Sequence, residues 1–417
     1  MPRFHIHTLG CKVNQAESET IAAALLSAGW TRAETADTSD VNILNTCTVT
    51  GEADTKNRKA IRSLLRAGDM PLIVTGCAIN IDDNAYGGID ARISCEADKC
   101  KVPSLAARLL GNAEPSRLDE LEHIELRAHG SYGFRTRVDL KIQDGCDNAC
   151  SYCIVHIARG PARSIPAATV LHQAQELANR GVRELVLVGI DLAAYADGDT
   201  DLARLSSLLL TQSTIGRVRI SSVEPQSVTS SLVNVLARSD GRLCRHLHLC
   251  LQSGSSKVLR EMNRHYDADA FASLVTQLRT AIPQCALSTD VIVGFPGESD
   301  EDFEQTCELV ENCGFMRLHV FRYSKRPGTP AAARIDQIDA RVKAMRSQKL
   351  IELGQRLALA DMERRIGTNE KVIIERPGIG TSESYHTVAC DPSLPVGELV
   401  PLTFTDIDIA KKRFVAQ

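Results

Sequence analysis

The chain has 417 residues, of which 43% are hydrophobic and 24% charged, and its net charge is −4. This composition indicates a globular protein of two or three domains and lacks the basic bias of a typical nucleic-acid binder. No apolar run approaches the roughly 18 residues of a membrane span, and the N-terminus lacks the apolar core of a signal peptide, so we expect a cytoplasmic protein. In that reducing compartment, the 14 cysteines favour metal binding over a disulfide framework.

The first part of the chain alternates between strand and helix patterns. A first helix is expected from Asn14, as its N-cap, to Gly29, and a second from Ala53 to Arg66. The expected strands are residues 4–8, 41–44 and 72–74. This order is that of a parallel α/β sheet, because strands joined by helical crossovers run parallel.

One cysteine follows each of these three strands: Cys11, Cys47 and Cys77. Parallel strands end on the same edge of the sheet, where open α/β sheets bind their ligands. The three thiols should therefore converge, and their repeated position favours one metal centre with three thiolate ligands. Taken singly, each cysteine is more often a small buried residue.

After a polar stretch at 113–134, which we interpret as a linker, strands and helices alternate again. Six strand–helix units predict a parallel sheet or an incomplete barrel, and residues 336–366 predict a long helix. The expected helices are 168–179, 202–210, 230–237, 268–281 and 301–313. The expected strands are 138–142, 184–188, 218–222, 247–251, 287–293 and 316–321.

A C-x3-C-x2-C loop follows the first of these strands and contains Cys146, Cys150 and Cys153. It therefore lies at the C-terminal face, where barrels of this kind keep their active sites. Thiolates select zinc, copper(I) or iron–sulfur clusters. Zinc normally takes a fourth ligand, whereas three cysteines on a four-iron cluster leave one iron open. The alternative is three unrelated buried thiols.

The last fifty residues have a different sequence pattern. Short strand patterns at 371–375, 385–389, 398–402 and 412–415 are separated by Gly, Pro, Ser and Asp. They predict a small all-β barrel.

The whole chain resembles the radical S-adenosylmethionine (SAM) methylthiotransferases. The resemblance implies an N-terminal α/β domain with a three-cysteine cluster (1–112), the linker (113–134), a radical SAM domain with an incomplete (βα)6 barrel (135–365) and a TRAM-type β-barrel (366–417). The fold class is thus α/β with a small all-β domain. Four segments are most similar to the branch that modifies N6-threonylcarbamoyladenosine in tRNA: HTLGCKVNQ (7–15), NTCTVTGEAD (45–54), VIVGFPGE (291–298) and YSKRPGTPA (323–331).

The resemblance also implies roles for single residues. Cys146, Cys150 and Cys153 would hold a [4Fe–4S] cluster whose open iron binds SAM, and Tyr152 would pack on the SAM adenine. The N-terminal cysteines would hold a second, auxiliary [4Fe–4S] cluster that handles sulfur. A 5′-deoxyadenosyl radical would remove the hydrogen at C2 of adenosine 37 in the tRNA anticodon loop. A methylthio group, with its methyl from a second SAM, would replace it, and a small electron-transfer protein would supply electrons.

Other site residues are expected from their place at strand ends. Gly189, in the strand-end segment 188–191 that includes Asp191, is a candidate SAM contact, as are Glu224 and Gln252, and the alternative for Glu224 is a solvated loop carboxylate. Four basic residues are candidate contacts to tRNA phosphates, which give position rather than sequence readout; each could instead be a solvated charge: Arg159, Arg163, Lys325 and Arg326.

Two positions depart from the family pattern, His156 after the cluster loop and Cys250 in the fourth strand of the central domain. A new ligand is possible at each, but a neutral substitution and a small buried residue are the simpler interpretations. Other functions stay open: a methylthiotransferase for isopentenyladenosine or for a ribosomal-protein aspartate, an iron–sulfur electron carrier, or an RNA-binding module. A carrier would have four ligands per cluster, so two sets of three favour catalysis.

Overall fold

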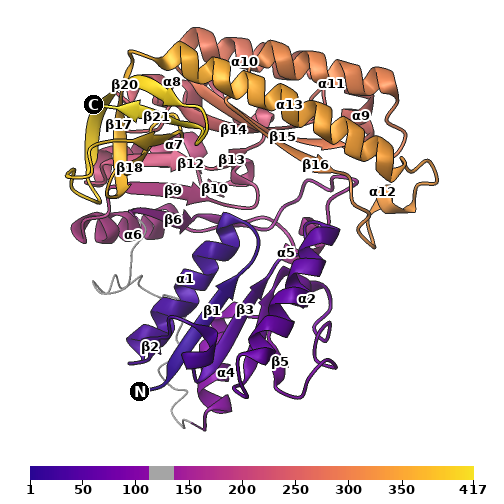
Figure 1. Ribbon diagram of the computed structural model, residues 1–417, viewed down its shortest axis with the longest axis vertical. Coiled ribbons are helices and arrows are strands. Elements are labelled where there is room, and N and C mark those ends of the chain that lie inside the picture. The colour runs from indigo at the N-terminus through magenta and orange to yellow at the C-terminus, as the bar shows by residue number, and fades with distance from the viewer. Residues whose placement is uncertain (112–135) are drawn as a thin grey trace.

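The computed structural model describes residues 1–111 and 136–417, so the predicted linker at 113–134 lies outside the described residues. Three units are arranged along it, with the N-terminal α/β unit against one end of the central unit and the small C-terminal barrel beside the other (Figure 1). Among the described residues, no helix has the length and apolar character needed to cross a membrane.

The N-terminal unit is a five-stranded parallel sheet in the order β2-β1-β3-β4-β5. The three strands expected from the sequence are confirmed, and two short edge strands were missed because two or three residues carry no readable pattern. The strands are β1 (Arg3–Thr8), β2 (Thr31–Arg32), β3 (Val41–Thr46), β4 (Leu72–Gly76) and β5 (Ile93–Cys95).

Asn14 does not cap the first helix, contrary to the expectation. The N-cap is Cys11, and Asn14 lies inside the helix. Its buried amide donates to the carbonyl oxygens of Leu9 (3.0 Å) and Thr46 (2.7 Å). Asn14 therefore ties together the loops that end β1 and β3. The helices of this unit are α1 (Lys12–Ser27), α2 (Gly51–Arg66), α3 (Cys77–Ile81) and α4 (Val102–Leu109).

The central unit is the incomplete barrel that the sequence predicts. Its parallel strands form two sheets, ordered β12-β9-β6 and β13-β14-β15-β16, which meet through a bridge between Val218 and Leu243. Leucines and valines of one strand face pack under the helices in one large core cluster, and alternate residues face the interior. The strands are β6 (Arg137–Lys141), β9 (Glu184–Val188), β12 (Arg217–Ile220), β13 (Ser222–Val223), β14 (His246–Gln252), β15 (Ala286–Val293) and β16 (Arg317–Arg322).

Helices cover the outside of this half-barrel (Figure 1). The long α13 (Ala340–Arg365) confirms the predicted final helix and packs along β16. The other helices are α5 (Val155–Arg159), α6 (Ala167–Asn179), α7 (Leu202–Gln212), α8 (Ser230–Arg238), α9 (Ser256–Glu261), α10 (Ala268–Ala281), α11 (Asp300–Cys313) and α12 (Pro330–Ala333). Two minor antiparallel pairs are β7 (Gln143–Asp144) with β8 (Arg163–Ser164), and β10 (Ala196–Asp197) with β11 (Thr200–Asp201).

The C-terminal unit is a closed five-stranded barrel ordered β17-β18-β19-β21-β20. Phe404 and Phe414 stack in its core with ring centroids 4.0 Å apart. The sequence did not reveal β18, which is short and contains a glycine. The strands are β17 (Asn369–Arg376), β18 (Ile379–Ser382), β19 (Thr387–Ala389), β20 (Leu399–Asp408) and β21 (Arg413–Ala416).

Buried charge joins this barrel to the floor of the half-barrel. Glu184 is fully buried between Arg217 and Arg219 and accepts hydrogen bonds from both guanidinium groups. The same arginines donate to the carbonyl oxygens of Thr381 and Ser382 in β18. Burial opposes the charge on Glu184, but the arginines lower the pKa of its carboxyl group to about 2. The small barrel is therefore docked through paired charges.

Candidate active site

The C-x3-C-x2-C loop leaves β6 at the C-terminal edge of the central sheet and leads into α5. Gly145 opens the loop with φ +74°, and a Cβ there would collide with the backbone of Pro161. Only glycine fits that close crossing. The expected position of the loop at the C-terminal face of the central sheet is confirmed.

Each of the three loop sulfurs receives an N–H group. The backbone amides of Asn148 and Val155 approach the Sγ atoms of Cys146 and Cys153 at 3.5 and 3.4 Å. The guanidinium group of Arg264 approaches Cys150 Sγ at 3.2 Å. Burial raises the pKa of Cys146 to about 12 and of Cys153 to about 11. The N–H donors would stabilise negative charge on the three sulfurs, whereas burial disfavours free thiolates at the same positions. Both features fit cysteines that bind a metal centre.

Asp191 borders this loop and was expected only as part of a strand-end segment. Its carboxylate accepts from Asn148 Nδ2 at 2.7 Å and lies 3.7 Å from Cys146 Sγ. Burial raises the pKa of Asp191. Arg264 was missed altogether, because it lies 114 residues beyond Cys150 and no spacing rule links them.

The structure brings Cys11, Cys47 and Cys77 together at the edge where β1, β3 and β4 end. Asn14 Oδ1 lies 3.6 Å from Cys11 Sγ and 3.9 Å from Cys77 Sγ. A Cβ at Gly10 would lie 2.9 Å from Cys47 Cβ. Cys47 and Cys77 are buried and Cys11 is exposed. Three converging thiols with one open side fit a soft metal centre that a substrate can reach.

Arg159, at the end of the helix that follows the cysteine loop, contacts the N-terminal cysteine site and is not an RNA contact, contrary to the expectation. It is 5% exposed, its Nε lies 3.3 Å from Cys77 Sγ, and it donates to Asn14 Oδ1 at 2.6 Å. Its guanidinium group also pairs with Glu17 at 2.5 Å and Asp144 at 3.2 Å. Burial opposes its charge, but these neighbours raise the pKa of Arg159 overall. A guanidinium group held in this way cannot reach a phosphate.

Arg326 is buried as well, which corrects its assignment as an RNA contact. It is 7% exposed and donates to Asp54 and Thr48, both at 2.6 Å. It therefore fastens the N-terminal unit to the loop after β16. Arg163 and Lys325 are exposed and remain candidates for phosphate contacts.

The candidate SAM contacts differ in what surrounds them. Glu224 pairs with Arg264, the residue that donates to Cys150. A Cβ at Gly189 would lie 2.9 Å from Gln143 Oε1, so this glycine is needed for packing inside the protein. Gln252 is buried at φ +65°, beside an irregularity in β14. Tyr152 is half-buried against an apolar cluster that includes Phe295.

The two departures from the family pattern lie in different surroundings. His156 lies in the short helix α5, and its Nδ1 is buried with no hydrogen-bond partner among the described residues. Cys250 is buried, and its burial raises the pKa of the thiol.

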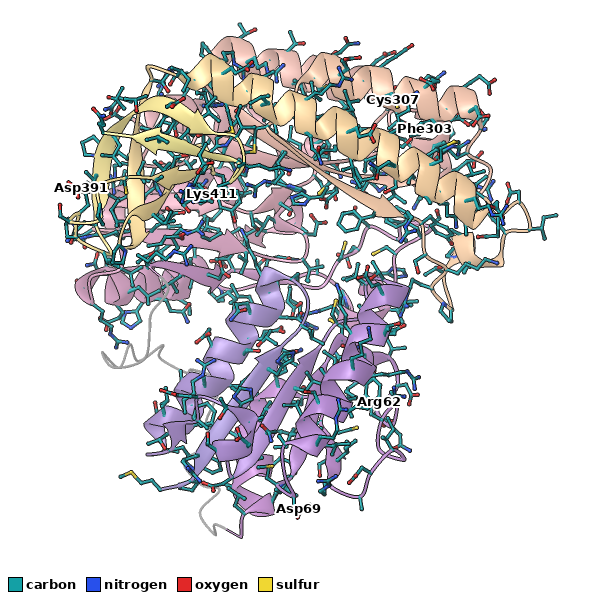
Figure 2. All side chains as sticks on the ribbon, viewed as in Figure 1. Arg62, Asp69, Phe303, Cys307, Asp391 and Lys411 are labelled. Carbon is teal, nitrogen blue, oxygen red and sulfur yellow. The ribbon has the colours of Figure 1, made fainter. Side chains whose placement is uncertain are left out.

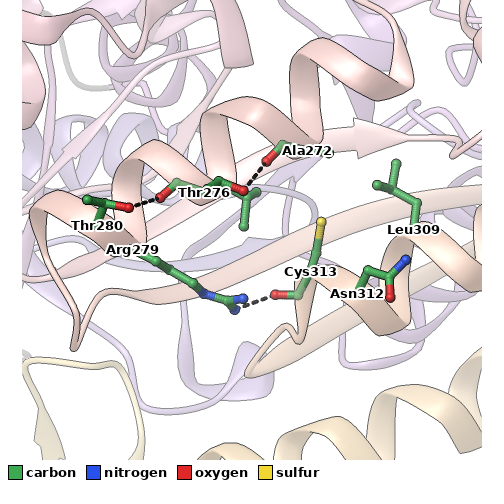
Figure 3. A pocket seen from close by; sticks show the side chains of 8 residues that line it. Ala272, Thr276, Arg279, Thr280, Leu309, Asn312 and Cys313 are labelled. Atoms are coloured by element: carbon green, nitrogen blue, oxygen red, sulfur yellow. Dashed lines mark hydrogen bonds between the residues drawn. The ribbon is translucent and has the colours of Figure 1, made fainter.

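A groove lies elsewhere, between α10 and α11 on the outside of the half-barrel (Figure 3). Arg279 crosses it and donates to the carbonyl oxygen of Gly314 at 2.9 Å. The groove bears no cysteine cluster and is away from the strand ends.

The half-barrel and the three-cysteine loop at its C-terminal face define the class of radical SAM proteins, and comparison with known protein families supports this class. The family described as the Radical SAM superfamily matches residues 140–310, and Uncharacterized protein family UPF0004 matches residues 3–90. A cobalamin-binding radical SAM methyltransferase from Kitasatospora setae shares the fold with a TM-score of 0.59 at 13% identity, over 80% of this chain and 77% of that one.

Proteins of similar sequence narrow this class to the methylthiotransferases. Threonylcarbamoyladenosine tRNA methylthiotransferase MtaB of Bacillus subtilis is 40% identical over 86% of this chain and 81% of its own length. The Thermotoga maritima protein of the same name is 35% identical over 90% and 87%. A tRNA-2-methylthio-N(6)-dimethylallyladenosine synthase of Roseobacter denitrificans is 32% identical over 97% and 96%. The chain belongs to the radical SAM methylthiotransferase family.

Proposed function

We propose that this protein is a tRNA methylthiotransferase that converts N6-threonylcarbamoyladenosine at position 37 to its 2-methylthio derivative. The observation that carries the proposal is the presence of two three-cysteine sites, with Arg159, on the helix that follows the cysteine loop, in contact with Cys77 Sγ of the N-terminal site. Relatives named for this substrate have identities of 35–40%, and those named for dimethylallyladenosine 30–33%.

The proposed cofactors are SAM and two [4Fe–4S] clusters, one on each cysteine triad. Together they supply radical chemistry at an unactivated ring carbon, which side chains alone cannot perform. The chain's own residues position these groups: Asn148 and Arg264 hold the loop sulfurs, while Asn14 and Arg159 hold the auxiliary site.

The tRNA would lie across the junction of the units. Arg163 and Lys325 are exposed and offer charge for backbone phosphates. The C-terminal barrel adds a second surface, on which Lys411 is exposed (Figure 2); small β-barrels commonly bind RNA. A small electron-transfer protein would reduce the site, and the reaction would take place in the cytoplasm.

Nucleoside analysis of tRNA from a deletion strain tests the substrate. The 2-methylthio form of threonylcarbamoyladenosine should disappear, the unmodified precursor should accumulate, and the intact gene should restore both. A methylthio form that stays at its normal level, in a strain with no second source, contradicts the proposal. Loss of the methylthio form of dimethylallyladenosine instead would assign the enzyme to the other tRNA branch.

Iron content tests the number of clusters. After anaerobic reconstitution we expect about eight irons per chain, because two cysteine triads each hold four. Cys47→Ala should retain about four, since it removes one ligand of the auxiliary site only. An iron content of about four in the unaltered protein would mean that the N-terminal cysteines do not hold a cluster.

A further inference from the structure

Three polar side chains meet on the inner face of the central sheet, at positions that the cysteine sites do not use. They are His248 on β14, Asp290 on β15 and His319 on β16. The register pairs Asp290 directly with His319, and His248 with Ser288, two residues before Asp290. Paired residues, and residues two apart in a strand, share one face of a sheet. All three side chains therefore point into the half-barrel.

Their ligand atoms are close enough for one ion. One nitrogen or oxygen atom of each residue lies within 4.8 Å of the other two. His248 Nε2 is 3.2 Å from Asp290 Oδ1, and the imidazole rings of His248 and His319 are 5.7 Å apart. Small side-chain rotations would bring the three atoms to the roughly 2.0–2.2 Å of metal–ligand bonds.

The ring of His248 is fixed in the way that a metal-binding histidine requires. Its Nδ1 lies 3.1 Å from Ser288 Oγ, which is also 3.1 Å from His246 Nε2. Its Nε2 is buried and has no hydrogen-bond partner among the described residues, although Asp290 is near. The ring is thus not aligned for a hydrogen bond to the carboxylate. One nitrogen held by a hydrogen bond and the other left without a partner is the arrangement found in metal sites.

We propose that His248, Asp290 and His319 bind one divalent transition-metal ion of the zinc or ferrous class. Two imidazole nitrogens and one carboxylate oxygen form the ligand set of mononuclear zinc and iron(II) sites with open positions. The open positions face the interior of the half-barrel. Cys250, the next inward residue of β14, is buried. The ion would therefore lie on the sheet face that lines the half-barrel.

Zinc binding to the reconstituted protein tests the proposal, because iron and sulfide then occupy the cluster cysteines. Zn²⁺ added to the protein with both clusters intact should bind at one equivalent per chain, measured by calorimetry and by elemental analysis after removal of free ion. His319→Ala and Asp290→Asn should each weaken binding at least 10-fold. Ser288→Ala should weaken it about 10-fold, as loss of a partner that orients a ligand does.

His265→Ala is the matched control, because this histidine is exposed and belongs to none of the sites; its zinc binding should equal that of the unaltered protein. Asp290→Asn keeps the shape of the side chain, and its thermal melting curve and iron content report whether fold and clusters are intact. The proposal would be overturned if the cluster-containing protein bound no zinc. It would also be overturned if neither His319→Ala nor Asp290→Asn weakened zinc binding.

Discussion

Replacing Cys153 by alanine is expected to abolish cleavage of SAM to 5′-deoxyadenosine and, with it, methylthiolation. Cys153 is one of three sulfurs in the loop after β6, each with its own N–H donor, and its replacement leaves the loop with two thiolates. The rate should fall at least about 10³-fold, which is roughly 4 kcal/mol of activation free energy. Anaerobic assays of 5′-deoxyadenosine by chromatography measure this directly.

Cys47→Ala separates the two sites. Its thiol belongs to the N-terminal triad, beside Gly10 and remote in sequence from the loop. SAM cleavage should therefore persist within a few-fold while methylthiolated tRNA is lost. If SAM cleavage also vanished in a folded Cys47→Ala protein, the division of roles between the triads would be wrong.

Cys307→Ala serves as the control for both variants. Cys307 is a buried residue of α11 that packs in the core, outside the two triads. Removing one buried sulfur there costs stability but should leave iron content and SAM cleavage unchanged. A comparable loss of activity in this control would mean that the cysteine variants act through general destabilisation.

The convergence of the N-terminal cysteines was predictable because it depends only on topology. A cysteine placed just after each parallel strand must come to the shared edge, whatever the packing behind it. The same reasoning located the cysteine loop on the active face. Most strands were found because their alternating or continuous apolar residues are visible in the sequence. The strands β2, which has two residues, and β18, which has four residues including a glycine, are too short to show such a pattern.

The environment of Arg159 was not predictable. An arginine after a cysteine loop looks from sequence like a solvated or RNA-facing charge, since arginine is almost never fully buried unless paired. Its partner Glu17 lies 142 residues earlier, on the helix that follows β1. The pairing depends on how the N-terminal and central units dock. The hydrophobic periodicity of the sequence identifies helices and strands but does not show how two units pack against each other. Arg326 with Asp54, 272 residues apart, was misjudged for the same reason.

Arg159→Met is expected to lower the free energy of unfolding by about 2–3 kcal/mol. Breaking one side of a buried ion pair typically costs about 3–5 kcal/mol, but Glu17 would keep Lys141 at 2.8 Å and Lys99 at 3.3 Å. Asp144 would likewise keep Lys141 at 2.8 Å. The loss should therefore fall below the usual range. Chemical denaturation of the cluster-containing protein, followed by circular dichroism, measures it.

Arg163→Met is the matched control. Arg163 pairs with the same carboxylate, Asp144, at 3.6 Å, but its side chain is 60% exposed whereas that of Arg159 is 2% exposed. Exposed pairs contribute about 0–1 kcal/mol, so this variant should unfold close to the unaltered protein. Equal denaturation midpoints for the two variants would show that the buried pairing of Arg159 contributes nothing beyond a surface ion pair.

A double variant, Arg159→Met with Glu17→Leu, decides whether charge pairing or packing is responsible. If the cost of Arg159→Met comes from leaving Glu17 buried with less compensation, removing that carboxylate should recover part of the loss, and the two effects should be non-additive. Arg159 also donates to Cys77 Sγ at 3.3 Å, and hydrogen bonds to cluster sulfurs influence reduction potential. The Arg159→Met protein should therefore show a shift in the potential of the auxiliary site, whatever its stability. A restored stability with an altered potential would show that one guanidinium group both docks the two units and sets the electronics of the sulfur site.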